Sequence, residues 1–349
     1  MKQWNQIKSE GIVSILFPML SIVFGLLGAA VVIAMLGVDP LTAYQKMFFG
    51  SFGSKSGLTF ALQYFMPLAF CALAVTLAYR GGVFNVGAEG QLFMGAVFST
   101  WAATGITGLP PAVHIPLTML VGAAAGGLWG FIPGYLKVKK GFSEVLVTVF
   151  MNYIAKNVVG ASVSTFLKEP NQGVNWSSKI PEVLQLKAFS GLGIHPGIII
   201  AVLIAAAMSY MLKNTAFGYD IKSVGLNREA AEYAGIEAKK TMIVTMVLSG
   251  AIASLAGSVE ILGVQYRLQE NFLTNYGYYA IPVALMGGLN PYGTLLTALF
   301  FAVLLNGATT IKVSMGVPVS IANVIMALTI ICSLAMNGLQ RLLHSKIRK

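Results

Sequence analysis

Charged side chains are scarce in this sequence of 349 residues, where Asp, Glu, Lys and Arg together make up only 10%. Soluble domains typically carry about 25% charged residues, so this deficit excludes an ordinary soluble protein. Two cysteines and three histidines are too few and too scattered for a disulfide framework or a metal site. The sequence also contains no Gly-Lys dipeptide, which excludes the P-loop that holds nucleotide phosphates.

Apolar residues are correspondingly abundant: they make up 56% of the chain, and the mean hydropathy is +0.76. A membrane-spanning helix needs about 20 apolar residues, and we therefore predict an all-α, polytopic transmembrane bundle that forms one domain over residues 1–349. The predicted spans are 12–36, 58–79, 84–108, 112–136, 144–167, 196–212, 241–265, 279–289, 293–312 and 316–339. The first run exceeds a signal-peptide core, whereas 279–289 is too short to cross alone and predicts a half-helix, a re-entrant segment or a broken helix.

Lys and Arg are distributed unevenly between the two sides of these spans. With the N-terminus inside, fifteen fall in internal segments and seven in external ones, so both termini are predicted to be cytoplasmic by the positive-inside rule. The same rule explains the net charge of +11 without a nucleic-acid partner. Two loops are longer than a turn: 168–195 is predicted to be external, and 213–240 to be cytoplasmic.

Small residues recur every four positions in the run 112–136, at Gly122, Gly126, Gly130 and Gly134. This spacing places them on one helix face, which allows another helix to approach closely in lipid. We expect this face to pack within the chain, with an interface to a second copy as the alternative.

The stretch RGGVFNVGAEGQ, residues 80–91, separates two apolar runs. Arg80 ends the run before it, and Gly81 and Gly82 can adopt the left-handed conformation that closes a helix. Asn85 is expected to be the N-cap of the following helix, whose first turn would contain Glu89 and gain from its negative charge. A sharp turn with a capped helix start therefore explains most of these residue types.

Glu89 and Gln91 also permit a functional interpretation, because polar groups at membrane depth often line a substrate path. The string GGVFNVG is similar to GGLNPYG, residues 287–293, so two interrupted helices could flank one route for the substrate. Further polar residues inside predicted spans include Asn152, Lys156 and Asn306. The candidate pathway residues are Asn85, Glu89, Gln91, Asn152, Lys156 and Asn306, and the alternative for each is a hydrogen bond between helices.

The internal loop contains GLNREAAEYAGIEAKK, residues 225–240. Asn227 is expected to cap a helix that continues through the alanines and ends at Lys239 and Lys240, with charges that complement the helix dipole. Its alanines, Ala230, Ala231, Ala234 and Ala238, would form a small face that fits a partner's groove. The alternative is an ordinary surface helix.

The string Glu229-Ala230-Ala231, with Gly235 four residues later, resembles the EAA-type coupling motif of ATP-binding cassette importer permeases. Together with RGGVFNVGAEGQLFMGA and ALMGGLNPYGTLL, it makes most of 58–338 similar to the permease group that serves ribose, branched-chain amino acids and nucleosides. Within this group the chain most resembles the nucleoside permeases that work with a substrate-binding lipoprotein.

This resemblance implies a nucleoside importer in the bacterial plasma membrane. It implies a second permease subunit that is a different chain, cytoplasmic ATPase subunits and an external substrate-binding lipoprotein. The coupling residues would be Asn227, Arg228, Glu229, Ala230, Ala231 and Gly235. No cofactor is expected on this chain, since the ATP and Mg²⁺ would be used by the partner ATPase.

Alternatives to a nucleoside permease differ in cargo or in energy source. The cargo could be ribose, another sugar or a branched-chain amino acid. A secondary transporter could instead couple transport to an ion, with a proton carried by Glu89 or Glu260. An enzyme is the least favoured reading, because no histidine, cysteine or carboxylate motif forms a nucleophile with its base or a metal site. We therefore predict no catalytic residues.

Overall fold

The structure of the chain is a computed structural model, which describes residue 20 and residues 23–170, 173–189, 195–321, 323–325, 327–328, 331–332 and 335. The beginning of the first predicted span, the end of the last one and both termini lie outside the described residues. Within these ranges every regular element is a helix. The only β-pairing there is two isolated bridges, Lys168 with Ser177 and Trp176 with Gln269.

Six helices in the described part are long and apolar enough to cross a membrane. They are α3 (Lys55–Arg80), α5 (Pro111–Lys140), α6 (Glu144–Ser164), α7 (Pro196–Asn214), α10 with its π-helical extension η2 (Ala238–Glu260 and Ile261–Gln265) and α12 (Pro291–Met315). A helix at Val23–Met35 and α2 (Pro40–Phe52) are bent by 115° and would together make a seventh span. The prediction of an all-α, multi-span membrane protein with a broken or short helix is confirmed.

The helix α2 has no counterpart among the predicted spans. Its apolar residues are interrupted by Gln45 and Lys46, so they do not form a run long enough to be recognised as a span. The helix begins at Pro40, and the Asp39 carboxylate accepts a hydrogen bond of 2.8 Å from the amide of Thr42. This is the usual way in which an N-cap side chain satisfies a free donor of the first turn.

The chain divides into two compact units, one made of 1–61 and 301–349 and the other of Leu62–Phe300, so the division falls inside α3 and α12. In the first unit, Asn306 lies on α12 and is almost fully buried. Its side-chain amide donates to the hydroxyl of Ser51 at 3.0 Å and to the carbonyl of Gly57 at 3.3 Å. Asn306 therefore joins α12 to the end of α2 and the start of α3.

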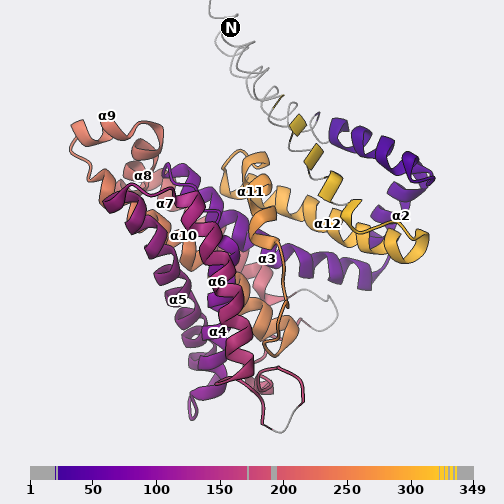
Figure 1. The fold of residues 1–349 in the computed structure, drawn as a ribbon, viewed down its shortest axis with the longest axis horizontal. Helices are drawn as coiled ribbons and strands as arrows, with labels where there is room; N and C mark the ends of the chain where they lie inside the picture. Colours follow the sequence, from indigo (N-terminus) through magenta and orange to yellow (C-terminus); the bar gives the residue numbers. More distant parts are fainter. Residues whose placement is uncertain are drawn as a thin grey trace, which may run out of the picture. The chain divides into compact units, whose positions relative to one another are not determined.

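In the second unit, α4 (Ala88–Gly105) is the central helix and packs against α5, α6, α10 and α11 (Tyr276–Met286). Figure 1 shows α4, α5, α6 and α10 running side by side. Small residues let α4 approach α10 closely, since a side chain on Gly95 or Gly257 would collide with the backbone of the other helix. Burial of α4 on nearly all sides makes it the axis of this unit.

The glycine face of α5 packs against α10 within the same chain. Gly126 and Gly130 lie so close to the backbone of Gly250 and Met246 that an added Cβ would collide with it. The expectation that this face packs inside the chain is confirmed. The close approach lets van der Waals contact between the two backbones hold α5 and α10 together, which is a common basis of helix association in lipid.

The helix α11 is only 11 residues long, which corresponds to about 16 Å at the usual rise per residue. A membrane core of about 30 Å is too thick for such a helix to cross. Figure 1 shows a long non-helical connection that leads from the far end of α10 back to α11. This helix replaces the predicted segment 279–289 and begins three residues before it.

Two short helices, α8 (Ala216–Leu226) and α9 (Arg228–Tyr233), connect α7 to α10. Figure 1 shows them at one end of the second unit, beside the ends of α5, α7 and α10. This is the end that the distribution of Lys and Arg predicts to be cytoplasmic.

Candidate functional site

The stretch of residues 80–89 holds both ends of the half-helix α11. At the start of α11, the carboxylate oxygens of Glu89 accept hydrogen bonds of 2.6 Å from the amides of Asn275 and Gly277. At its end, Nε of Arg80 donates to the carbonyl of Leu289 at 2.8 Å. A negative charge thus meets the amino end of α11 and a positive charge meets its carboxyl end, which complements the helix dipole and satisfies free backbone groups.

The two glycine turns that are similar in sequence also have the same hydrogen-bond pattern. Gly82 and Gly288 have φ angles of +72° and +65°, a conformation that glycine adopts without steric cost. The next residues, Val83 and Leu289, each donate to the carbonyl five positions earlier, at 3.1 and 3.0 Å. Because Arg80 bonds to the second turn, the ends of α3 and α11 lie beside each other.

Asn85 is not the N-cap of α4, contrary to the prediction. The N-cap is Gly87, and α4 begins at Ala88. The Asn85 oxygen accepts from the amide of Gly87 at 2.9 Å, while its NH₂ group donates to Gln91 at 2.8 Å and to the hydroxyl of Ser249 at 2.7 Å. Asn85 is fully buried, so its amide fixes the entry to α4 and ties it to α10.

Asn152 connects α6 to the same region. Its oxygen accepts from the amide of Gly90 at 2.9 Å, and its NH₂ group donates to the carbonyl of Val86 at 3.0 Å and to the Tyr278 hydroxyl at 3.1 Å. Asn85, Glu89, Gln91 and Asn152 are therefore all buried with hydrogen-bond partners. In the described structure, each of them has a clear role in joining helices.

Lys156 differs from these residues because it is exposed on α6. It lies one turn beyond Asn152, near the middle of a helix that is long enough to span. Within the described residues it forms no ion pair. A charge in hydrocarbon is costly, so its ammonium group needs water or another chain at this face. Asn306, the remaining candidate, belongs to the first unit.

The short helix α9 begins as predicted. The Asn227 oxygen accepts from the amide of Ala230 at 3.0 Å, which confirms Asn227 as the N-cap. However, α9 ends at Tyr233, and Gly235 has a φ angle of +84°. The predicted continuation to residue 240 is wrong because this left-handed turn breaks the helix. Lys239 therefore lies in the first turn of α10 instead of the last turn of α9.

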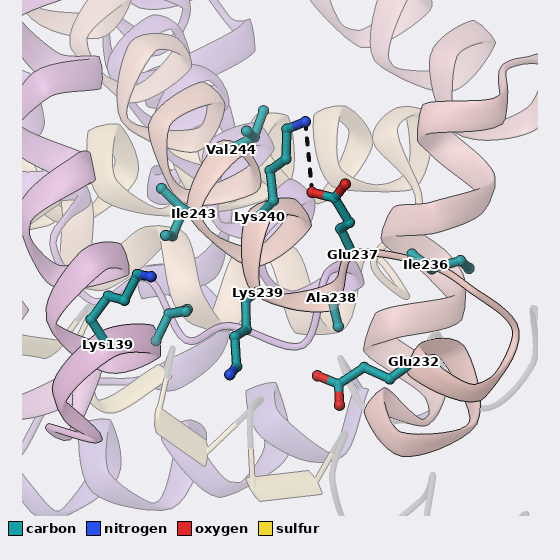
Figure 2. Close-up of a pocket in the computed structure, with 10 residues that line it drawn as sticks. Lys139, Glu232, Ile236, Glu237, Ala238, Lys239, Lys240, Ile243 and Val244 are labelled. Carbon is teal, nitrogen blue, oxygen red and sulfur yellow. Dashed lines mark ion pairs between the residues drawn. The ribbon is translucent and has the colours of Figure 1, made fainter.

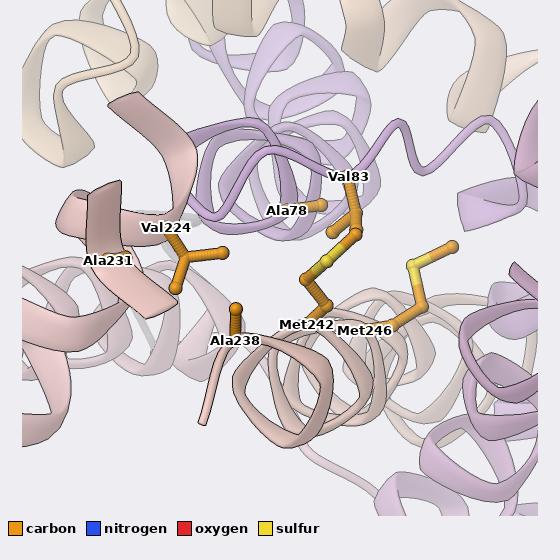
Figure 3. Close-up of a cluster of buried hydrophobic side chains, with 7 residues drawn as sticks. All are labelled: Ala78, Val83, Val224, Ala231, Ala238, Met242 and Met246. Carbon is orange, nitrogen blue, oxygen red and sulfur yellow. The ribbon is translucent and has the colours of Figure 1, made fainter. Parts of the chain in front are cut away.

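The predicted alanine face is divided, since Ala230 and Ala234 are exposed whereas Ala231 and Ala238 are buried. Ala231 and Ala238 are only 3% and 1% exposed and pack with Val224 and Met242. Figure 3 shows them with the other members of this cluster, Ala78, Val83 and Met246. The two buried side chains let α9 lie close to the bundle, so only Ala230 and Ala234 of this face remain open to a partner.

The last residue of α8 and the helix α9 together expose large and charged groups. Leu226 is 89% exposed and Tyr233 is 93% exposed, and Arg228 forms an ion pair of 3.1 Å with Glu232 one turn later. Glu229 and Ala230 are also exposed. We call Leu226, Arg228, Glu229, Ala230 and Tyr233 the α9 surface. The sequence offered a signal for it, since Leu226 and Tyr233 are bulky apolar residues in a polar loop.

Two hollows lie on either side of the connection from α9 to α10. The larger, of about 540 Å³, is lined by Val138, Lys139, Glu232, Ile236, Glu237, Ala238, Lys239, Lys240, Ile243 and Val244. Figure 2 shows Lys139 and Glu232 reaching it from different helices, and the 3.7 Å ion pair of Lys240 with Glu237 at its edge. The smaller, of about 370 Å³, extends over Phe217, Asp220 and Gly235. Hollows beside an exposed helix are the kind of surface to which a protein partner binds.

The end of α8 touches the glycine turn after α3. A Cβ on Gly225 would collide with the carbonyl oxygen of Arg80 and would come within 3.1 Å of the amide of Gly82. The loop that carries α9 is therefore in backbone contact with the residues that hold α11.

The loop predicted to be external is tied to the chain that leads to α11. The Ser177 hydroxyl accepts from the amide of Leu268 at 2.8 Å, and the guanidinium of Arg267 lies 5.0 Å from the centre of the Trp176 ring. At the end of this loop, His195 caps α7 by accepting from the amide of Gly197 at 3.0 Å. Burial lowers the pKa of His195, because it disfavours the charged imidazolium.

The sequence of this chain is similar to those of known membrane transport proteins. The family model described as "Branched-chain amino acid transport system / permease component" matches residues 57–334. The guanosine ABC transporter permease protein NupP of Bacillus subtilis is 34% identical, covering 96% of this chain and 97% of its own. The nucleoside ABC transporter permease protein NupB of Lactococcus lactis is 35% identical (90% and 88%). The glucose ABC transporter permease protein TsgB13 of Haloferax volcanii is 34% identical (90% and 85%).

Proposed function

Because the chain belongs to the family of branched-chain amino acid transport system permease components, we propose that it imports a nucleoside as the membrane subunit of an ATP-binding cassette transporter. It is a multi-pass protein of the bacterial plasma membrane. The observation that carries the proposal is the exposed α9 surface. A buried apolar cluster packs behind it, and the backbone of Gly225, next to this surface, contacts Arg80, which binds the end of α11.

The motor is a separate polypeptide in this proposal. A cytoplasmic ATPase binds the α9 surface and uses ATP and Mg²⁺ at its own site, since this sequence has no P-loop. Asn227 and Gly235 set the shape of the docking segment by starting and ending α9. Arg228, Glu229 and Ala230 face the ATPase, whereas Ala231 anchors the helix to the bundle.

The cargo is a nucleoside, delivered from outside by a substrate-binding lipoprotein. Two relatives of similar identity are named for guanosine and for nucleosides, and this supports the nucleoside class. The relative named for glucose is about as similar, so identity alone does not separate a nucleoside from a sugar. A second permease chain, different from this one, completes the path and covers the face that carries Lys156.

In this proposal the path runs along the exposed face of α6 that carries Lys156, beside α4 and α11. We infer that Lys156 faces the cargo or the water around it, because an exposed ammonium group in a spanning helix needs a polar neighbour. Asn85, Glu89, Gln91 and Asn152 shape this route by fixing α4 and α11. Asn306 contributes by fixing α12 in the first unit.

Coupling then needs only a difference in contacts between two states of the transporter. Closure of the ATPase pair moves α9, and the contact of Gly225 with Arg80 passes this movement to the turn at Gly82. Since Arg80 and Glu89 hold the two ends of α11, that half-helix moves with the turn. The route opens or closes where α11 begins.

Reconstitution of the complete transporter in liposomes tests this function. We expect uptake of guanosine that requires ATP, the ATPase subunit and the binding protein together. Uptake that persists without the ATPase and collapses with the proton gradient would instead support an ion-coupled carrier. ATP-driven uptake of ribose or leucine with no uptake of any nucleoside would change the cargo but not the mechanism.

A further inference from the structure

Backbone strain in the second unit is concentrated around α11. Four non-glycine residues in the described part of the chain have positive φ angles, and they are Tyr266, Asn271, Asn275 and Leu289. All four lie between the π-helical turn that ends α10 and the turn that follows α11. Strained residues and π-helical turns persist where the surrounding structure holds them, and they are frequent at functional sites.

Three tyrosine rings meet at the start of this half-helix. The rings of Tyr64 on α3 and Tyr276 on α11 are stacked, with centroids 6.5 Å apart and planes at 22°. Tyr279, one turn along α11, meets Tyr276 edge-on at 6.4 Å. We call Tyr64, Tyr276 and Tyr279 the tyrosine cluster.

The three tyrosine side chains differ in how much of their surface is exposed. Tyr276 is only 9% exposed and forms the back of the cluster, whereas Tyr64 and Tyr279 are half-buried. The two outer rings therefore present part of their surface beyond the packed interior. They do so beside the only described half-helix whose amino end is held by a carboxylate from another helix.

Polar groups accompany the rings. The side-chain amide of Gln265 donates to the carboxylate of Glu260 at 3.1 Å, and this carboxylate is buried at the end of α10. Aromatic faces with a nearby hydrogen-bond acceptor match the two parts of a nucleoside. A base can stack on a ring, and a ribose hydroxyl can donate to a carboxylate.

We propose that the tyrosine cluster is a stacking site for the base of the transported nucleoside, with Tyr64 and Tyr279 as the rings that contact it. This proposal rests on the proposed function and names the part of the cargo that the permease recognises. The site favours a cargo with an aromatic ring over a free sugar, because a sugar has no aromatic face for π-stacking. Such a preference in the permease would add to that of the binding protein.

The first test replaces the outer rings in the intact transporter. Tyr279→Phe and Tyr64→Phe keep the ring, whereas Tyr279→Leu and Tyr64→Leu remove it at similar volume. We expect the Phe variants to import guanosine close to the wild-type rate and the Leu variants to import it about tenfold more slowly. Tyr210→Leu is the matched control, because Tyr210 is 65% exposed on α7 and lies outside the cluster.

Equal guanosine uptake by the Phe and Leu variants, whether normal or reduced, would overturn the stacking role. The variants are compared only after gel filtration shows that each transporter assembles. If wild-type protein imports no nucleoside at all, the proposed function fails first. If it imports guanosine and the Leu variants match the Phe variants, only the stacking site fails.

A second test does not depend on transport rate. The assembled transporter is irradiated with radiolabelled 8-azidoguanosine, and labelled peptides are identified by mass spectrometry. We expect label on the peptide that contains Tyr64 or on the one that contains Tyr276 and Tyr279, reduced by excess guanosine but not by excess ribose. Label confined to other peptides, or equal protection by ribose, would overturn the proposal.

Discussion

The amide of Gly277 donates a hydrogen bond of 2.6 Å to the Glu89 carboxylate, although the two residues are 188 positions apart in the sequence. A Cβ on Gly277 would collide with the backbone of Glu89, so the helices α4 and α11 meet almost backbone to backbone. Glu89 therefore acts as the remote cap of a half-helix. Its carboxylate is already bonded to the amides of Asn275 and Gly277 without a substrate.

Replacement of Glu89 separates the capping role from a proton-carrying role. In Glu89→Gln one oxygen still accepts a hydrogen bond, but the new NH₂ group faces a backbone donor, and in Glu89→Ala both bonds are lost. We expect Glu89→Ala to destabilise the protein by about 2 kcal/mol and Glu89→Gln by less, with uptake reduced in the same order. Thermal unfolding of the purified transporter and guanosine uptake measure this.

Glu182→Gln is the control for this pair, because Glu182 is exposed and lies outside the spanning helices. A proton relay would give a different result: Glu89→Gln would then abolish uptake as completely as Glu89→Ala, without loss of stability.

Gly225→Ala tests the contact between the α8–α9 loop and the glycine turn. The added methyl group would collide with the carbonyl oxygen of Arg80, so the loop has to move away. We expect at least a tenfold loss of uptake per ATP hydrolysed, with ATP hydrolysis itself retained. Both rates are measured in the same liposomes.

The matched control is Gly173→Ala, since no atom lies within 4 Å of a Cβ at Gly173. Normal uptake by Gly225→Ala would show that the contact does not carry the coupling movement.

The α9 surface is tested by removing its largest exposed side chain. Tyr233→Ala removes a ring that is 93% exposed, so the permease itself should fold normally. Removal of a buried aromatic anchor typically costs an interface 2 kcal/mol or more. We expect the variant to retain about 5% or less of the ATPase in pull-down from detergent at limiting concentration. Phe142→Ala, which changes another exposed ring of this end, should retain the wild-type amount.

Accessibility of position 156 tests whether Lys156 faces water. In a variant without Cys71 and Cys332, Lys156→Cys should react with a membrane-impermeant charged thiol reagent, and guanosine should slow the reaction. Tyr153→Cys, on the same helix and also exposed, is the comparison. If position 156 reacts no faster than position 153, Lys156 does not line an aqueous route.

The pH dependence of stability follows from His195. Burial lowers its pKa below the ordinary value of 6.5, so the unfolded chain binds a proton more readily than the folded one. Stability should therefore be full above about pH 6.5 and fall as the pH drops through the unfolded-state pKa towards the lower folded-state pKa. His195→Asn, whose side-chain oxygen can still accept from Gly197, should weaken this dependence. Unfolding midpoints between pH 5 and 8 measure the difference, and parallel curves would contradict it.

Local patterns predicted the spanning helices and the start of α9. Apolar runs identify spans because lipid requires them, and Asn227 is a cap because its side chain bonds within its own turn. Glycines spaced by four predicted that this face of α5 packs within the chain, since the spacing alone defines a helix face. That its partner is α10 was not predicted.

Contacts between distant segments were not predictable in this way. Nothing near Glu89 in the sequence indicates that its carboxylate binds the start of α11, since this depends on how α4 and α11 pack. The direction of the alanine face was predicted for Ala230 and Ala234 but not for Ala231 and Ala238, because small residues fit equally well against a partner or against the bundle. Here the bundle covers Ala231 and Ala238.

Arg80 and Glu89 are nine positions apart, and between them they contact the two ends of an 11-residue helix. The length of the segment 80–89 is therefore matched to the length of α11. An insertion or deletion of a single residue in either segment would leave one end unsupported. Among natural variants of this chain, length changes in the two segments should occur together or not at all.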